Sequence, residues 1–219
     1  MYLAGLTTVL FDWDGTLCDS GGAVMRAFER SLAEFDVHFT REQYTAVYTP
    51  AWTVMYEAFG LAKPFWPQAE QRWMFHFQSE EPVLLPGAAQ VLATLRQAGL
   101  RLGLVTGATR DRLVHELPRL GVEGLFATVI GHEDVVNKKP HPEGIETSLE
   151  RLNADARNCC FVGDAPDDIR MGQSAGVRTI GVCSEYVDLA RLEACSPDYL
   201  LRSVAELPSI LPAAAAGSL

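Results

Sequence analysis

The chain has 219 residues, of which 48% are hydrophobic and 21% are charged, and its formal net charge is −10. These values are typical of a globular protein with one good core, or of a core domain with a smaller satellite. Because binding to nucleic-acid phosphates relies on clustered Lys and Arg, the acidic balance argues against a nucleic-acid partner. No apolar run approaches the roughly 20 residues that a membrane-spanning helix needs, so we expect no membrane partner either.

The cysteines favour a reduced, cytoplasmic protein. There are five, an odd number, and no two of them form a Cys-x-x-Cys motif. The N-terminus also lacks the basic start, apolar block and small-residue cleavage site of a secretory signal. We therefore expect partly buried free thiols and a cytoplasmic location. Cys159 and Cys160 are adjacent in a segment with strand character, so their side chains are predicted to face opposite sides of a sheet.

The most informative segment is residues 7–20, which read TTVLFDWDGTLCDS. Its apolar, β-branched start predicts a buried strand that ends in a loop with two carboxylates. Side chains alternate along an extended chain, so Asp12 and Asp14 are predicted to point the same way and Trp13 the other. Two like charges this close need a cation between them, or a proton on one of them. Either remedy indicates chemistry at this loop.

The following block, residues 19–82, shows helical periodicity and almost no strand signal. Helices are predicted over residues 20–35, over two stretches between Thr40 and Gly60 that are separated at Thr49-Pro50, and within residues 67–79. Aromatic residues recur in the block at helical spacing, which favours a packed core over a ligand-binding wall. We expect an inserted helical domain over residues 19–82, lying as a lid over a site at the end of the first strand.

From residue 83 the pattern changes to strands that alternate with helices. Strands are predicted at 101–105, 128–130, 159–162, 178–182 and 199–201, and helices at 88–98, 110–120, 142–152, 169–174 and 205–211. This alternation predicts an α/β fold with a doubly wound parallel sheet, formed by residues 1–18 and 83–219. Ligands of such sheets bind beyond the carboxyl ends of the strands, at a topological switch point.

Four polar clusters each follow a predicted strand. They are Asp12-Trp13-Asp14-Gly15-Thr16, Thr106-Gly107, Lys138-Lys139-Pro140, and Gly163-Asp164-Ala165-Pro166-Asp167-Asp168. The acidic groups form a hard oxygen site that suits magnesium. A hydroxyl and backbone N–H groups can hold phosphoryl oxygens, and a lysine can neutralise charge on carboxylate and phosphate. The clusters together predict metal-assisted chemistry on a phosphate group.

With these motifs in this order, the chain resembles the haloacid dehalogenase superfamily. The motifs are Asp-x-Asp-Gly-Thr-Leu from Asp12, Lys-Pro-x-Pro from Lys139 and Gly-Asp-x-x-x-Asp from Gly163, and the resemblance extends over roughly residues 6–211. Within the superfamily, the chain is similar to the phosphatases with a helical cap after the first strand, such as phosphoglycolate phosphatases and β-phosphoglucomutases. The resemblance implies a Rossmann-like core with an inserted helical cap and an aspartyl-phosphate mechanism.

The resemblance also implies a role for each catalytic residue. Asp12 would attack phosphorus and become the aspartyl-phosphate, and Asp14 would act as the acid and then the base. Thr106 and the N–H of Gly107 would bind the phosphoryl group, and Lys139 would stabilise its charge. Many relatives have Ser-Asn or Thr-Asn at the second motif, so this chain keeps the hydroxyl but lacks the side-chain amide.

The implied metal is magnesium, held by Asp12, the backbone carbonyl of Asp14, and Asp164, with Asp168 in direct contact or in the surrounding shell. Asp167 is expected to face solvent or to cap the following helix. Lys138 is expected at the surface. Four cations of the helical block are candidates for binding a substrate's anionic group, although a surface role is favoured for each: Arg26, Arg41, Lys63 and Arg72.

We therefore predict a magnesium-dependent phosphatase of a small-molecule phosphate monoester, as a monomer or a homodimer. A phosphomutase of the β-phosphoglucomutase type would keep the same core residues, so it stays an alternative. Dehalogenation is disfavoured by Asp14, since a departing halide needs no proton. A phospho-accepting signalling module is disfavoured because such modules have about 120 residues and no long helical insertion. A catalytically dead binding protein is disfavoured because all four clusters are retained.

Overall fold

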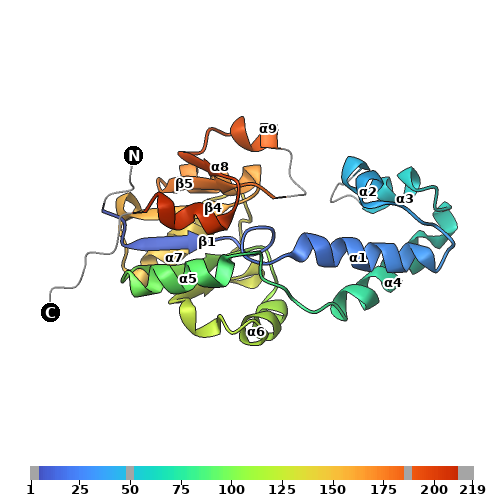
Figure 1. Cartoon of the computed structure of the whole chain (residues 1–219), viewed down its shortest axis with the longest axis horizontal. Coiled ribbons are helices and arrows are strands. Elements are labelled where there is room, and N and C mark those ends of the chain that lie inside the picture. The colour runs from blue at the N-terminus through green and yellow to red at the C-terminus, as the bar shows by residue number, and fades with distance from the viewer. Residues whose placement is uncertain (1–4, 48–51, 185–188, 212–219) are drawn as a thin grey trace. The chain divides into compact units, whose positions relative to one another are not determined.

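The structure is a computed structural model that describes residues 5–47, 52–184 and 189–211. The predicted break at Thr49-Pro50 lies outside these residues. The chain divides into two compact units (Figure 1). Residues 1–19 and 83–219 form one, which we call the α/β unit, and residues 20–82 form the other, which we call the helical unit. In the described part of the chain, no helix combines the length and hydrophobicity needed to span a membrane.

The α/β unit contains, among its described residues, one six-stranded sheet in the order β3-β2-β1-β4-β5-β6. Its strands are β1 (Thr8–Phe11), β2 (Arg101–Val105), β3 (Thr128–Ile130), β4 (Cys159–Gly163), β5 (Arg178–Val182) and β6 (Tyr199–Leu201). Every neighbouring pair is parallel. Phe11 at the end of β1 lies beside Leu104 of β2 and Val162 of β4. The strand order reverses at β1, so the carboxyl ends of β1, β2 and β4 form the expected switch point.

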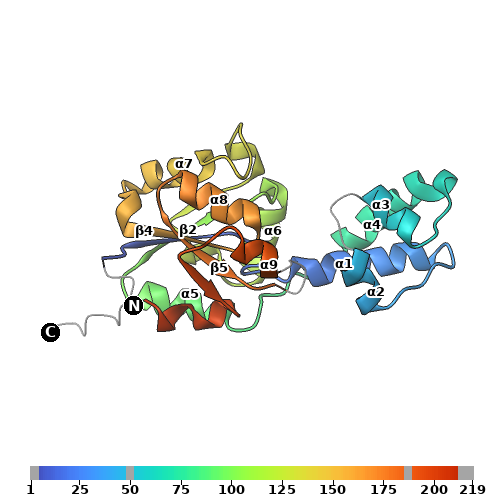
Figure 2. The ribbon, with the colours of Figure 1, turned by 90° about the horizontal axis from the view of Figure 1, so that it is seen from above.

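Helices cover both faces of this sheet, as predicted. They are α5 (Ala88–Gln97), α6 (Arg110–Arg119), α7 (Glu143–Leu152), α8 (Pro166–Ser174) and α9 (Leu189–Glu193), with 3₁₀ turns at Glu123–Leu125, His132–Asp134, Ala156–Asn158 and Val204–Ser209. Figure 2 shows α5 on one side of the strands and α7 and α8 on the other. The short helix α9 was not predicted. Helix α8 begins three residues before the predicted start at 169, with Pro166 in its first turn, where a missing N–H costs no hydrogen bond.

Among the described residues, a hydrophobic core lies on each face of the sheet, because side chains alternate along each strand. Phe11 and Cys160 pack in the core that contains residues of α5 and α6. Leu10 and Cys159 pack in the other core, with residues of α7 and α8. The prediction that Cys159 and Cys160 face opposite sides is confirmed.

The helical unit comprises α1 (Ser20–Ala33), α2 (Arg41–Val47), α3 (Trp52–Ala58), a 3₁₀ turn at Lys63–Phe65 and α4 (Trp66–Gln78). Its aromatic residues form a core of their own, as predicted. Phe28 is fully buried and its ring stacks on Tyr56 at a centroid distance of 5.5 Å. Phe39 and Phe59 stack at 4.6 Å beside it. This unit therefore has an interior that does not depend on the sheet.

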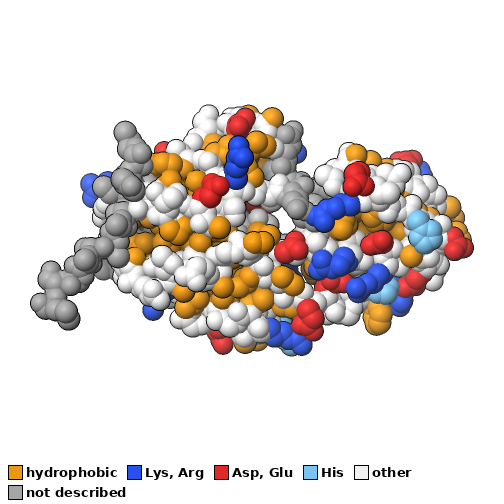
Figure 3. Space-filling model, in the orientation of Figure 1, with side chains coloured by type: hydrophobic (Ala, Val, Ile, Leu, Met, Phe, Trp, Pro, Cys, Tyr) orange, Lys and Arg blue, Asp and Glu red, His pale blue; other side chains and the backbone are white. Residues whose placement is uncertain are grey.

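On the face of the helical unit seen in Figure 3, several cationic side chains lie beside acidic ones. Arg26 Nε lies 2.7 Å from Glu80, and Arg72 Nε lies 2.6 Å from Glu34. Lys63 lies over the ring of Trp66, with its Nζ 5.7 Å from the centroid. These contacts inside the unit agree with the surface role that the sequence favours.

Candidate active site

Four of the predicted site residues are buried at the carboxyl edge of the sheet. Asp12 follows β1, Thr106 follows β2 and Asp164 follows β4, and their exposed fractions are 5%, 5% and 7%. Asp168 lies in the first turn of α8 and is 1% exposed. The β3–α7 connection brings Lys139 to the same edge. Because β1 lies between β2 and β4, the parallel topology itself gathers these side chains.

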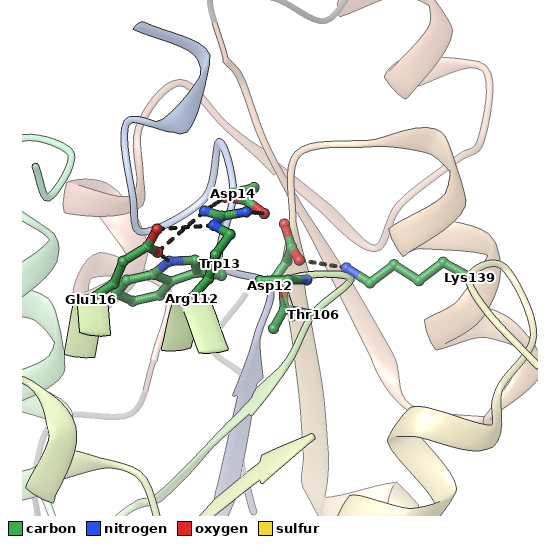
Figure 4. Close-up of polar contacts among 8 residues, drawn as sticks. Asp12, Trp13, Asp14, Thr106, Arg112, Glu116 and Lys139 are labelled. Carbon is green, nitrogen blue, oxygen red and sulfur yellow. Dashed lines mark hydrogen bonds and ion pairs between the residues drawn. The ribbon is translucent and has the colours of Figure 1, made fainter. Parts of the chain in front are cut away.

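Asp12, Asp164 and Asp168 each offer a carboxylate oxygen, and these three atoms lie within 4.8 Å of one another. The ammonium of Lys139 bridges two of them, at 2.5 Å from Asp12 Oδ1 and 2.7 Å from Asp168 Oδ1. Figure 4 shows Lys139 reaching Asp12 from the side opposite to Asp14 and Arg112. The second oxygen of Asp168 accepts a hydrogen bond of 3.0 Å from the N–H of Ala165. The motifs that contain Asp12, Lys139 and Asp164 therefore meet in one site.

The site has more negative than positive charge. Burial raises the pKa of Asp12 well above its usual range, against the effect of Lys139 and together with that of Asp168 and Asp164. Burial and the neighbouring Asp168 raise the pKa of Asp164 to about 7. Burial alone would lower the pKa of Lys139, but Asp12 and Asp168 raise it, so Lys139 is an ammonium. Three carboxylates around one ammonium favour the binding of a further cation.

These three carboxylates are the donor set that a magnesium ion prefers, since Mg²⁺ binds hard oxygen ligands. Two glycines leave room for the carboxylates of Asp164 and Asp168 at this site. Gly15 has φ +78°, and a Cβ on it would lie 2.3 Å from Oδ2 of Asp164. A Cβ on Gly163 would lie 2.4 Å from Cβ of Asp168. The residues present therefore fit the predicted metal.

The second motif borders a pocket of about 120 Å³ whose lining includes Thr106, Gly107 and Lys139. The Thr106 hydroxyl oxygen accepts a hydrogen bond of 3.0 Å from the N–H of Ala108. Gly107 is exposed, and a Cβ on it would meet no atom within 4 Å. The space for the missing amide side chain is therefore open at this position.

The neighbours of the site residues lie largely as predicted. Lys138 is exposed, and its ammonium donates to the backbone carbonyls of His132 and Val135. Asp167 is exposed and pairs with Arg170 at 3.0 Å, within α8. Neither side chain joins the buried carboxylates.

The structure differs from the prediction that the side chains of Asp12 and Asp14 point the same way. The Asp14 carboxylate is not in the group formed by Asp12, Asp164 and Asp168, but binds the guanidinium of Arg112 through both oxygens, at 2.8 and 3.2 Å. Each of the two close carboxylates thus has its own cation, Lys139 for Asp12 and Arg112 for Asp14. The cause is that β1 ends at Phe11 and the loop then turns, so the alternation of an extended strand no longer applies.

Sequence reasoning missed Arg112 and its partner Glu116. Glu116 accepts from Arg112 at 2.9 Å and from the indole N–H of Trp13 at 2.7 Å (Figure 4). Burial alone would lower the pKa of Arg112, but Asp14 and Glu116 raise it. The spacing of four residues between Arg112 and Glu116 was visible as a helical ion pair. No pattern connected it to Asp14, 98 residues earlier.

Known proteins match this chain over almost its whole length. The sequence profile of the haloacid dehalogenase-like hydrolases matches residues 9–182. The pyrophosphatase PpaX of Bacillus pumilus is 30% identical over 213 residues, covering 95% of this chain and 97% of that protein. The PpaX of Listeria welshimeri is 31% identical over 214 residues, covering 94% and 96%.

Solved structures agree on the fold. A predicted phosphoglycolate phosphatase of Haemophilus somnus 129PT has a TM-score of 0.76 at 20% identity, with 94% of this chain and 98% of that one covered. A candidate β-phosphoglucomutase of Thermotoga maritima has a TM-score of 0.77 at 22% identity, with the same coverage of 94% and 98%.

This chain belongs to the haloacid dehalogenase-like hydrolases. It is therefore classed as a hydrolase, and the relatives that are about 30% identical over nearly its whole length are named pyrophosphatases. The resemblance inferred from the three motifs is therefore confirmed. The similarity to proteins named pyrophosphatases was not predicted.

Proposed function

We propose that this chain is a magnesium-dependent phosphatase that hydrolyses a small-molecule phosphate monoester through an aspartyl-phosphate on Asp12. The observation that carries the proposal is the buried Asp12 carboxylate, 2.5 Å from the Lys139 ammonium and beside Asp164 and Asp168. A carboxylate and a phosphate dianion repel each other, so attack requires nearby positive charge. This arrangement supplies one cation and the ligands for another.

In the first half of the reaction, an oxygen of Asp12 forms a bond to phosphorus while the bond from phosphorus to the leaving oxygen breaks. Asp14 donates a proton to that leaving oxygen. In the second half, Asp14 takes a proton from a water molecule, which attacks phosphorus and releases Asp12. Throughout, Thr106, the N–H of Gly107 and Lys139 hold the phosphoryl oxygens and offset their charge.

The magnesium ligands would be the carboxylates of Asp12, Asp164 and Asp168 and the backbone carbonyl of Asp14. When bound, the ion offsets negative charge on the phosphoryl group and on the buried carboxylates. This part of the proposal is supported by the donor set and by the excess negative charge of the site.

We propose that the helical unit is a cap that closes over the substrate and excludes bulk water. It is inserted between Asp19 and Val83, only a few residues after the Asp12–Asp14 loop. Inside the α/β unit, a backbone β-bridge between Cys18 and Leu84 joins the entering segment to the returning one, and another links Cys18 to Asp14 within the entering segment. Cap movement would therefore act close to the catalytic loop. The free cysteines agree with the cytoplasmic location that we propose.

Inorganic pyrophosphate is a second candidate substrate, because the PpaX proteins are about 30% identical over nearly the whole chain. Its hydrolysis would use the same residues, since a phosphoanhydride also has a terminal phosphoryl group. A phosphomutase would keep these residues as well, but the candidate β-phosphoglucomutase of Thermotoga maritima, at 22% identity, is similar to this chain in fold alone.

The proposal is tested with a substrate panel of pyrophosphate, phosphoglycolate, sugar phosphates and p-nitrophenyl phosphate. Each is assayed with magnesium and with EDTA, for the wild type, Asp12→Asn and Asp168→Asn. Asp167→Asn is the matched control, because Asp167 is the exposed neighbour of a buried predicted ligand. We expect turnover only with magnesium, none with Asp12→Asn, and wild-type rates with Asp167→Asn.

Full activity in EDTA, or in Asp12→Asn, would overturn the mechanism. Isomerisation of a sugar phosphate without phosphate release would support the mutase instead. The substrate turned over with the highest kcat/KM would decide between a monoester and pyrophosphate.

A further inference from the structure

Asp14 is held by the guanidinium of Arg112, a residue that has no role in the proposed reaction. Arg112 Nη2 lies 2.8 Å from Oδ1 of Asp14, and Nη1 lies 3.2 Å from Oδ2. Both oxygens of the carboxylate are therefore occupied at the same time. Such a two-point contact between a guanidinium and a carboxylate defines orientation as well as position.

Arg112 is itself held from a second direction. Its Nε and Nη2 lie 2.9 and 3.2 Å from the two oxygens of Glu116, one turn further along α6. The indole N–H of the fully buried Trp13 donates to Glu116 at 2.7 Å and so anchors it to the hydrophobic core. Figure 4 shows the guanidinium between the two carboxylates, with Trp13 below it.

This arrangement makes the contact to Asp14 reversible. One guanidinium faces two carboxylates, so the charge of Arg112 stays balanced by Glu116 when Asp14 moves away. Leaving a half-buried cation without any partner would be costly, and here that cost does not arise. Asp14 and Arg112 are also partly solvated, with side-chain exposures of 34% and 27%.

The geometry suits one part of the proposed reaction and obstructs another. Both oxygens of Asp14 accept N–H bonds from Arg112, and an unprotonated carboxylate of this kind is the group that can take a proton from water. To protonate a leaving oxygen, Asp14 must instead present an O–H to the substrate. At least one of the bonds to Arg112 has to be exchanged for that contact.

We propose that Arg112 is a positioning residue that holds Asp14 between turnovers and has to release it before the leaving group is protonated. This inference rests on the proposed function, in which Asp14 is the acid. It predicts that the contact slows cleavage of alkyl phosphates, whose alkoxide needs a proton, and not of aryl phosphates with a stable leaving anion.

The kinetic test compares glycerol 2-phosphate with p-nitrophenyl phosphate, by kcat/KM in saturating magnesium, for Arg112→Gln and Arg112→Lys. Lysine keeps the charge but cannot bind both oxygens in a fixed fork. A partly exposed ion pair such as this one is worth about 1 kcal/mol, or roughly fivefold in rate. We expect the alkyl-to-aryl ratio to rise about fivefold in Arg112→Gln and by less in Arg112→Lys.

The matched control is Arg110→Gln, because Arg110 is on the same helix but pairs at the surface with Asp134. We expect it to leave the ratio unchanged. An unchanged ratio in Arg112→Gln, with both rates lowered alike, would mean a merely structural role and would overturn the inference. A lower ratio would mean that Arg112 orients Asp14 productively, which would overturn it too.

A second measurement needs no activity. The urea unfolding of wild type, Asp14→Asn, Arg112→Gln and the double variant forms a cycle that isolates the energy of the pair. We expect the two single changes to be non-additive, and full additivity would overturn the inference. If the pair is coupled but the wild type hydrolyses neither ester with magnesium, it is the proposed function that fails.

Discussion

The ammonium nitrogen of Lys139 lies 2.5 Å from Oδ1 of Asp12, although the two residues are 127 positions apart in the chain. Both side chains are largely buried, with exposures of 21% and 7%. Lys139 opposes the rise that burial causes in the pKa of Asp12, and in the proposed reaction it would also supply positive charge to the phosphoryl group.

Lys139→Met is expected to lower both stability and activity. Removing one partner of a buried ion pair leaves the other uncompensated, so the metal-free protein should lose about 3 kcal/mol in free energy of unfolding. Loss of one charge-stabilising group should lower kcat about 10²-fold or more. Urea unfolding and steady-state kinetics check the two effects. Lys138→Met is the control, and equal losses in both variants would contradict the role of Lys139.

Gly15→Ala is expected to abolish magnesium-dependent activity. The left-handed φ of +78° would cost about 1–2 kcal/mol with a side chain, and the new Cβ would lie 2.3 Å from Asp164 Oδ2. Gly60→Ala is a matched control, because Gly60 has φ +76° and a Cβ on it would meet no atom within 4 Å. Magnesium titrations should show weakened binding only for Gly15→Ala. Similar titrations for both variants would show that strain alone, and not the approach of Asp164, matters.

Gly107→Asn is expected to improve phosphate binding. The space beside Gly107 is open, so the added amide fits and can donate to a phosphoryl oxygen. One hydrogen bond contributes about 1 kcal/mol, which corresponds to a roughly fivefold lower KM. Inhibition by inorganic phosphate should tighten in parallel. Gly124→Asn, also without close neighbours, is the control. A higher KM in Gly107→Asn would mean that the phosphoryl group binds elsewhere.

The stability of the metal-free protein is expected to depend on pH through Asp164. Its pKa in the folded protein is raised from the ordinary value of 3.8 to about 7. Between pH 3.8 and 7, the folded state therefore keeps a proton on Asp164 that the unfolded state has lost. Stability relative to Asp164→Asn should therefore fall as the pH rises from about 4 to 7, and stay level above 7. Saturating magnesium should reduce this slope, because the ion favours the carboxylate. Urea unfolding at several pH values measures the difference, and a slope of opposite sign would contradict it.

Most of the fold could be predicted because it depends on local patterns. The strand before Asp12, the Gly-Asp turn at Gly163 and the helix after Thr109 each follow from a few neighbouring residues. Helix α9 was missed because its five residues are too few to show a helical period. The early start of α8 was missed because Pro166 reads as a loop residue, although proline is well suited to a first helical turn.

The sequence by itself determined that Asp12, Thr106, Lys139 and Asp164 lie at the ends of parallel strands or in the connections after them, and parallel strands place such residues at one edge. Only the tertiary structure decided which cation each carboxylate binds. Asp12 and Asp14 are two residues apart, yet one pairs with Lys139 and the other with Arg112. The reason is physical, because the choice depends on how a loop turns after Phe11 and on which side chains from α6 and the β3–α7 connection reach it.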